Sequence, residues 1–143
     1  MTRPPVGLLD TSAVIALPAV ADATDLPERP LISAITLAEL AVGPLATDDL
    51  AERARRQAVL QQAEGDFRAL PFDDAAARAF GIVAVGLRAR GRTRSARAFD
   101  VLIAAVALAH ELPLFTTNAA DFVGIPGLVV HAVPVPRAGP PAS

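Results

Sequence analysis

Short apolar runs alternate with longer amphipathic stretches along the chain, and each kind predicts a different element. Continuous apolar runs are typical of parallel strands that are buried on both faces of a sheet. Stretches with apolar residues three or four positions apart predict helices with one buried face. The runs that predict strands are 6–9, 31–33, 67–72, 114–116 and 128–130, and the stretches that predict helices are 12–17, 34–42, 50–64, 74–90 and 95–110.

Strands that alternate with helices at this spacing predict an α/β fold, a three-layer α/β/α sandwich with a mostly parallel five-stranded sheet. Right-handed crossovers would bring every strand-to-helix junction to the same edge of that sheet. At 143 residues the chain fits one domain. We expect this domain to span residues 1–133, followed by a proline-rich tail, 134–143, that is expected to be disordered.

Several helix boundaries are marked by residues that cap helices or end them. Ser33 precedes the second predicted helix, which Gly43-Pro44 should end. Asp49 and Glu52 resemble a capping box at the start of the third helix, which Gly65 should end. We expect the apolar stripe of that helix to consist of Leu50, Ala54 and Ala58.

The composition excludes several kinds of chemistry. The chain has no cysteine, so disulfides, thiolate metal sites and cysteine nucleophiles are absent. All 13 basic residues are arginine, which excludes a Walker P-loop and a Schiff-base enzyme because each needs a lysine. The longest apolar runs, 79–87 and 101–109, are much shorter than the roughly 20 residues of a membrane helix. We expect a cytoplasmic protein, since Asp10 interrupts the one segment that faintly resembles a signal peptide.

Four acidic residues fall at or near the predicted strand-to-helix junctions: Asp10, Glu39, Asp100 and Asp121. Each has a simpler explanation by itself, since Asp10 could only cap the next helix and Glu39 could face solvent. Asp100 could complement a helix N-terminus, and Asp121 could lie in a turn. The apolar segments around Glu39 and Asp100, however, predict that these carboxylates are packed rather than solvated.

Packed carboxylates that face one another must take up protons or share a cation. Carboxylate ligands without cysteine or histidine select hard cations, so Mg²⁺ or Mn²⁺ is the expected metal. Such an ion can activate water for attack on a phosphodiester. Ser12, Thr117 and Asn118 are then expected to orient the carboxylates or the water.

Four ordered blocks carry a family resemblance over nearly the whole chain. The blocks are Leu-Leu-Asp10-Thr-Ser, Ile-Thr-Leu-Ala-Glu39-Leu, Phe-Asp100-Val-Leu-Ile-Ala-Ala and Leu-Phe-Thr-Thr117-Asn118-Ala-Ala-Asp121-Phe. Together they resemble the PIN-domain ribonucleases, specifically the VapC-type toxins of type II toxin–antitoxin systems. The resemblance implies Mg²⁺- or Mn²⁺-dependent cleavage of RNA, with water as the nucleophile and a 3′-hydroxyl as the leaving group. It also implies transfer or ribosomal RNA as substrate, a homodimer, and inhibition by a cognate VapB-type antitoxin.

On this resemblance, Asp10, Glu39, Asp100 and Asp121 form the catalytic acidic quartet. The first three are expected to bind the metal, and Asp121 to bind it or to support a ligand. An arginine-rich segment is a candidate for RNA contacts, because arginine binds phosphate through two hydrogen bonds at once. Its members are Arg88, Arg90, Arg92, Arg94 and Arg97.

Two other interpretations compete with a ribonuclease toxin. One is a non-catalytic PIN-like module that binds RNA or its antitoxin. The other is a haloacid-dehalogenase-like phosphohydrolase, which would need a second aspartate where Ser12 stands. The net charge of −2 is only a mild objection to RNA binding, because four of the acids would lie in the metal pocket. His110 and His131 are expected to be structural.

Overall fold

The structure, a computed structural model, describes residues 3–89 and 98–136. Within these residues, five strands form one sheet in the order β3-β2-β1-β4-β5, and all neighbouring strands are parallel. The predicted fold class is therefore confirmed. The strands are β1 (Val6–Leu9), β2 (Arg29–Ser33), β3 (Ala69–Leu70), β4 (Leu114–Thr116) and β5 (Val130–Ala132).

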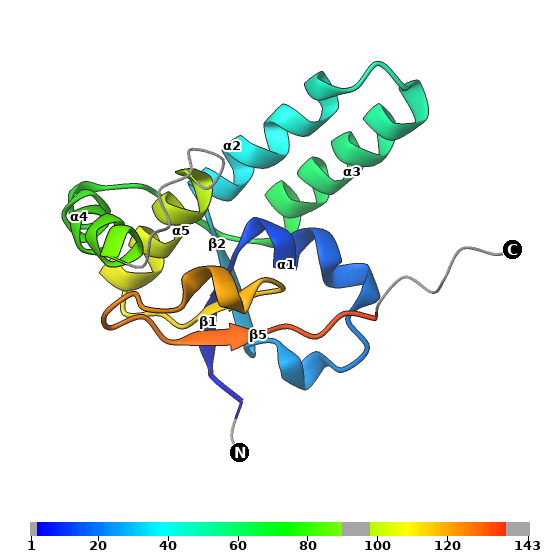
Figure 1. The fold of residues 1–143 in the computed structure, drawn as a ribbon. Helices are drawn as coiled ribbons and strands as arrows, with labels where there is room; N and C mark the ends of the chain where they lie inside the picture. The colour runs from blue at the N-terminus through cyan, green and yellow to red at the C-terminus, as the bar shows by residue number, and fades with distance from the viewer. Residues whose placement is uncertain (1–2, 90–97, 137–143) are drawn as a thin grey trace, which may run out of the picture.

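Helices pack on both sides of this sheet. Figure 1 shows α2 and α3 as a pair that extends away from the sheet, with α4 and α5 side by side in a second group. Short 3₁₀ turns occupy several of the connections, among them η5 (Ala119–Phe122) after β4. The helices in the described part are α1 (Thr11–Ala16), α2 (Ala34–Val42), α3 (Leu50–Asp66), α4 (Asp74–Ala89) and α5 (Ala98–Ala109).

Alternate residues of the central strands fill two separate cores. Leu8 and Leu114 are register partners that face the core lined by α4 and α5. Leu9 and Phe115, the next pair along the same two strands, belong to the opposite core, with α1 and the C-terminal part of α3. Burial on both faces explains why β1 is a continuous apolar run, and it fixes the residue after Leu9 at the carboxyl edge of the sheet.

Polar residues begin four of the helices, as the sequence suggests. The side chains of Asp10, Ser33, Asp49 and Asp73 each accept a hydrogen bond from a backbone N–H in the first turn. Such a cap typically contributes about 1 kcal/mol. The first two caps also fix the directions in which α1 and α2 leave the edge of the sheet.

Helix α3 differs from the prediction. The expected stripe is wrong, because Leu50 is 76% exposed and Ala54 and Ala58 are exposed too. The helix also continues through Gly65 to Asp66 and packs through its C-terminal half, where Ala63 is 1% exposed. Its N-terminal half extends past the sheet beside α2, so no core lies below the predicted stripe.

Other boundaries differ by a few residues. Strand β3 is only two residues long, and β5 begins at Val130 instead of 128. Two glycines with positive φ, Gly124 (92°) and Gly127 (80°), lie in the turns before β5. The predicted end of the fourth helix at residue 90 and most of the predicted tail lie outside the described residues. In the part of the chain that is described, no helix combines the length and apolar character needed to cross a membrane.

Candidate active site at the carboxyl edge of the sheet

Asp10 lies at the carboxyl end of β1, the central strand of the sheet, and is only 2% exposed. Its Oδ1 atom accepts hydrogen bonds from the backbone N–H of Ala13 at 2.9 Å and from the Ser12 hydroxyl at 2.6 Å. Asp10 therefore does cap α1, as the simpler interpretation held. Ligands of open α/β sheets bind at this same edge, so the cap and a functional role are compatible.

Burial raises the pKa of the Asp10 carboxyl above its ordinary value of 3.8, and hydrogen bonds from Ser12, Thr116 and the backbone partly offset this effect. The direction of the shift means that removal from water outweighs the local hydrogen bonds. A charged Asp10 therefore destabilises the protein unless a positive charge is placed next to it.

A hydroxyl network joins Asp10 to the end of β4. The Ser12 and Thr116 hydroxyl oxygens are 3.3 Å apart, and the Ser12 oxygen also accepts a hydrogen bond from the Thr117 N–H at 3.1 Å. The Asn118 N–H donates to the Thr116 oxygen at 3.0 Å. Thr117 and Asn118 thus enter this network through their backbones, and Thr116, which the sequence analysis omitted, supplies the side chain. Its position as the last residue of a buried strand, one place before the predicted Thr117, was the available signal.

Glu39 lies in the middle of α2 and is half-buried. Its Oε1 atom is buried and has no hydrogen-bond partner among the described residues. Glu39 and Thr11, the residue after Asp10, line the same cavity of about 390 Å³. A buried carboxylate oxygen without a partner is costly, so this atom fits a ligand to a cation.

The other two predicted acids lie on elements further along the chain. Asp100 lies in the first turn of α5 and Asp121 in η5, and both are half-buried. Within residues 3–89 and 98–136, no three side chains of histidine or acidic residues come close enough together to hold a metal ion. The convergence of all four acids therefore stays a prediction, and Asp10 and Glu39 are its best-supported members.

The predicted arginine segment is described only at Arg88. Arg88 is exposed in the last turn of α4, while Arg90, Arg92, Arg94 and Arg97 lie outside the described residues. A second group of arginines, which the sequence analysis did not propose for RNA contacts, lies on α3. Arg55 and Arg56 both bind the Glu52 carboxylate, at 2.6 and 3.0 Å, and line the Glu39 cavity. Their spacing of three and four residues from Glu52 was the sequence signal. The same contacts explain why Glu52 completes no capping box.

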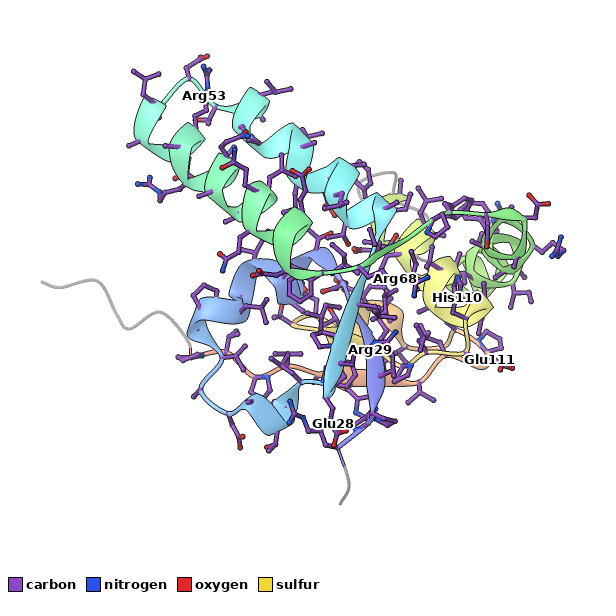
Figure 2. All side chains as sticks on the ribbon, turned by 180° about the vertical axis from the view of Figure 1, so that it is seen from behind. Glu28, Arg29, Arg53, Arg68, His110 and Glu111 are labelled. Atoms are coloured by element: carbon purple, nitrogen blue, oxygen red, sulfur yellow. The ribbon has the colours of Figure 1, made fainter. Side chains whose placement is uncertain are left out.

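The two histidines do not join the acids. His110 directly follows α5, and Figure 2 shows it next to Glu111 at the end of that helix. His131 lies in β5, where its ring stacks on Phe115 with centroids 4.7 Å apart. Packing therefore accounts for His131 without a role in proton transfer.

Comparison with known proteins identifies the family. The PIN domain family matches residues 8–128, a range that includes all four predicted acids. The chain belongs to this family. Within the PIN domain family it is 39% identical over 128 residues to Ribonuclease VapC5 of Mycobacterium tuberculosis, covering 88% of this chain and 92% of that protein.

Solved structures of related complexes share the fold of this PIN domain. The VapBC-5 toxin–antitoxin structure from Mycobacterium tuberculosis matches with a TM-score of 0.78 at 37% identity, over 91% of this chain and all of the other. FitAcB from Neisseria gonorrhoeae matches with a TM-score of 0.66 at 28% identity, over 87% and 95% of the two chains. The family excludes the haloacid-dehalogenase interpretation and agrees with the four ordered blocks.

Proposed function

We propose that this PIN domain protein is an endoribonuclease toxin of the VapC type that hydrolyses RNA phosphodiesters with Mg²⁺ or Mn²⁺. The observation that carries the proposal is the buried carboxylate of Asp10 at the sheet edge, together with the buried Oε1 atom of the half-buried Glu39 on α2. Asp10 has a raised pKa, and Glu39 has a buried oxygen without a hydrogen-bond partner in the described part of the chain. Both features favour a positive charge nearby, and carboxylate oxygens are the ligands that a hard cation prefers.

In this proposal Asp10 and Glu39 hold the metal, and Asp100 and Asp121 complete the acidic quartet. A cation held by these residues would supply an activated water and would neutralise charge on the phosphate. The water oxygen would bond to phosphorus as the P–O3′ bond breaks, and one proton of the water would pass to O3′, which leaves a 5′-phosphate and a 3′-hydroxyl. Ser12 holds one oxygen of Asp10 through its 2.6 Å hydrogen bond, so the carboxylate keeps its orientation during the reaction. The backbones of Thr117 and Asn118 fix Ser12 and Thr116 in turn.

Cleavage of RNA by the purified protein tests this function. Wild-type protein should cut RNA when Mg²⁺ or Mn²⁺ is present and should be inactive in EDTA. Asp10→Asn keeps the shape of the side chain but removes its charge, so cleavage should be lost. Asp22→Asn is the matched control, because Asp22 is an exposed aspartate that accepts backbone and hydroxyl hydrogen bonds in the same way. Full activity in Asp10→Asn would refute the proposal, and metal binding without cleavage would favour a non-catalytic module.

We also propose inhibition by a VapB-type antitoxin. An apolar groove on this chain fits such a partner, because two cavities of about 340 and 390 Å³ share Ile15 and Val59 as lining residues. Ile15 is 57% exposed between them, so the groove runs along α1 and α3. Its wall includes Glu39, so a segment bound there would block access to the proposed catalytic carboxylate.

Further parts of the proposal concern the assembly and the substrate. A homodimer is supported by the outer face of α4, where Ile82 and Val85 are 52% and 65% exposed. We propose transfer or ribosomal RNA as the substrate and the cytoplasm as the location. The arginines of the predicted segment, Arg88, Arg90, Arg92, Arg94 and Arg97, are the proposed phosphate contacts. Mapping the 5′ ends of cellular RNA after induction, with Asp10→Asn as the control, would identify the substrate.

A further inference from the structure

We propose that a buried hydrogen bond between Thr11 and Thr36 sets the separation of Asp10 and Glu39, and thereby selects a small cation. Thr11 and Thr36 would be positioning residues, since neither is proposed to touch the metal or the RNA. The inference rests on the proposed function, because it concerns the cation that these carboxylates bind.

Each threonine is tied closely to one of the two acids. Thr11 directly follows Asp10 and is the first residue of α1. Thr36 precedes Glu39 by three residues on α2, so the two side chains lie on the same face of that helix. The hydroxyl of Thr11 donates to that of Thr36 at 3.1 Å, and the two residues are 8% and 0% exposed.

This bond is a direct polar link between α1, which Asp10 caps, and α2, which carries Glu39. No other side-chain hydrogen bond joins α1 to α2 among the described residues. The starts of both helices are fixed to the sheet edge, α1 by the Asp10 cap and α2 by Ser33. The Thr11–Thr36 contact therefore determines how closely the helices approach one turn further on, where Glu39 lies.

A hydrogen bond brings two atoms closer together than an apolar contact does. The two hydroxyl oxygens are 3.1 Å apart, whereas two methyl groups in the same place would meet at about 3.5–4.0 Å. Replacing both threonines by valine should thus move α1 and α2 apart by roughly half an ångström, a displacement large enough to disturb a preorganised site. Mg²⁺ requires ligands at about 2.0–2.1 Å in near-ideal geometry, while Ca²⁺ accepts about 2.3–2.6 Å and irregular geometry. Wider spacing should therefore weaken Mg²⁺ binding more than Ca²⁺ binding.

The test compares Thr11→Val, Thr36→Val and the double variant with the wild-type protein. Urea unfolding in EDTA measures stability, and calorimetric titration measures the affinities for Mg²⁺ and Ca²⁺. Each single variant leaves one buried hydroxyl without its partner and should be less stable, while the double variant should recover most of the loss. The double variant should still bind Mg²⁺ about 10-fold more weakly, with Ca²⁺ affinity nearly unchanged. Thr36→Ser keeps the hydroxyl and should bind both ions like the wild type, although the loss of a buried methyl group should lower its stability.

A purely structural role for the two threonines predicts a different result. Stability and Mg²⁺ affinity would then recover together in the double variant, or the affinities for both ions would fall equally, and either outcome would overturn the inference. If the wild-type protein still cleaved RNA with Mg²⁺ after either of these outcomes, the proposed function would stand and only the inference about the two threonines would fall. A wild-type protein that binds neither ion would overturn the inference and the metal-dependent function together.

Discussion

The two roles of Asp10, as a helix cap and as a buried charge, can be separated by two substitutions. Asp10→Asn keeps an oxygen that accepts from Ala13 and Ser12, and asparagine caps helices about as well as aspartate. Asp10→Ala removes the acceptor of the Ala13 N–H, while the Ser12 hydroxyl keeps Thr116 as a partner. Loss of such a cap costs about 0.5–2 kcal/mol, so the alanine variant should be less stable than the asparagine variant by about this amount.

The pH dependence of stability reports the charge separately from the cap. Because burial raises the pKa of Asp10 above 3.8, the unfolded chain releases this proton at a lower pH than the folded protein does. The folded state therefore holds more protons between the two pKa values, and the contribution of Asp10 to the free energy of unfolding falls as the pH rises through that window. Both substitutions should remove this decline. Asp10→Asn should therefore be at least as stable as the wild type at pH 7 without metal.

Urea unfolding of the three proteins in EDTA, at a series of pH values from 4 to 8, measures both effects. The Asp22→Asn variant controls for removal of an exposed, capping carboxylate. Equal stability of the alanine and asparagine variants would refute the contribution of the cap. A decline with pH in Asp10→Asn as steep as in the wild type would refute the burial argument.

Two further predictions concern the support of the site and its surroundings. Gly7→Ala should destabilise the protein by about 1–3 kcal/mol in urea unfolding, because a Cβ atom there would lie 2.5 Å from the buried Phe115 ring; an unchanged or higher unfolding midpoint would contradict this packing argument. Glu111→Gly should stabilise by about 1 kcal/mol in the same assay, because Glu111 has a φ of 54° in the turn that ends α5. RNA cleavage should stay unchanged in Glu111→Gly, since the residue lies just before the start of β4, opposite the edge that carries Asp10, and a loss of activity would count against the placement of the site.

The part of the fold that depends on local patterns could be predicted from the sequence. The span of α2 from Ala34 to Val42, its Ser33 cap and the span of β4 all agree with the prediction. These elements combine a strong cap or breaker with a buried apolar run, so local chemistry and tertiary packing favour the same boundaries.

The features that depend on tertiary position could not be predicted in this way. The pattern of Leu50 on α3 looks like a buried stripe, but the helix extends past the sheet and leaves this residue exposed. Figure 2 shows Arg53 at the end of the α2–α3 pair that lies far from the sheet. Its guanidinium donates to the backbone oxygens of Pro44 and Thr47 in the connection between the two helices. The hydrogen bond between Thr11 and Thr36 joins elements that are distant in sequence, and no local pattern reveals it. No local pattern reveals either that the buried Glu39 oxygen has no hydrogen-bond partner among the residues that the structure describes.

Binding of Mn²⁺ to wild-type protein and to Glu39→Gln is the most direct test of the proposed metal site. Titration calorimetry should show saturable binding to the wild type and affinity at least about 10-fold weaker in Glu39→Gln, because the amide cannot supply a charged ligand. Glu64→Gln on the exposed surface of α3 is the matched control and should bind like the wild type. Equal Mn²⁺ affinity in the wild type and Glu39→Gln would contradict the account.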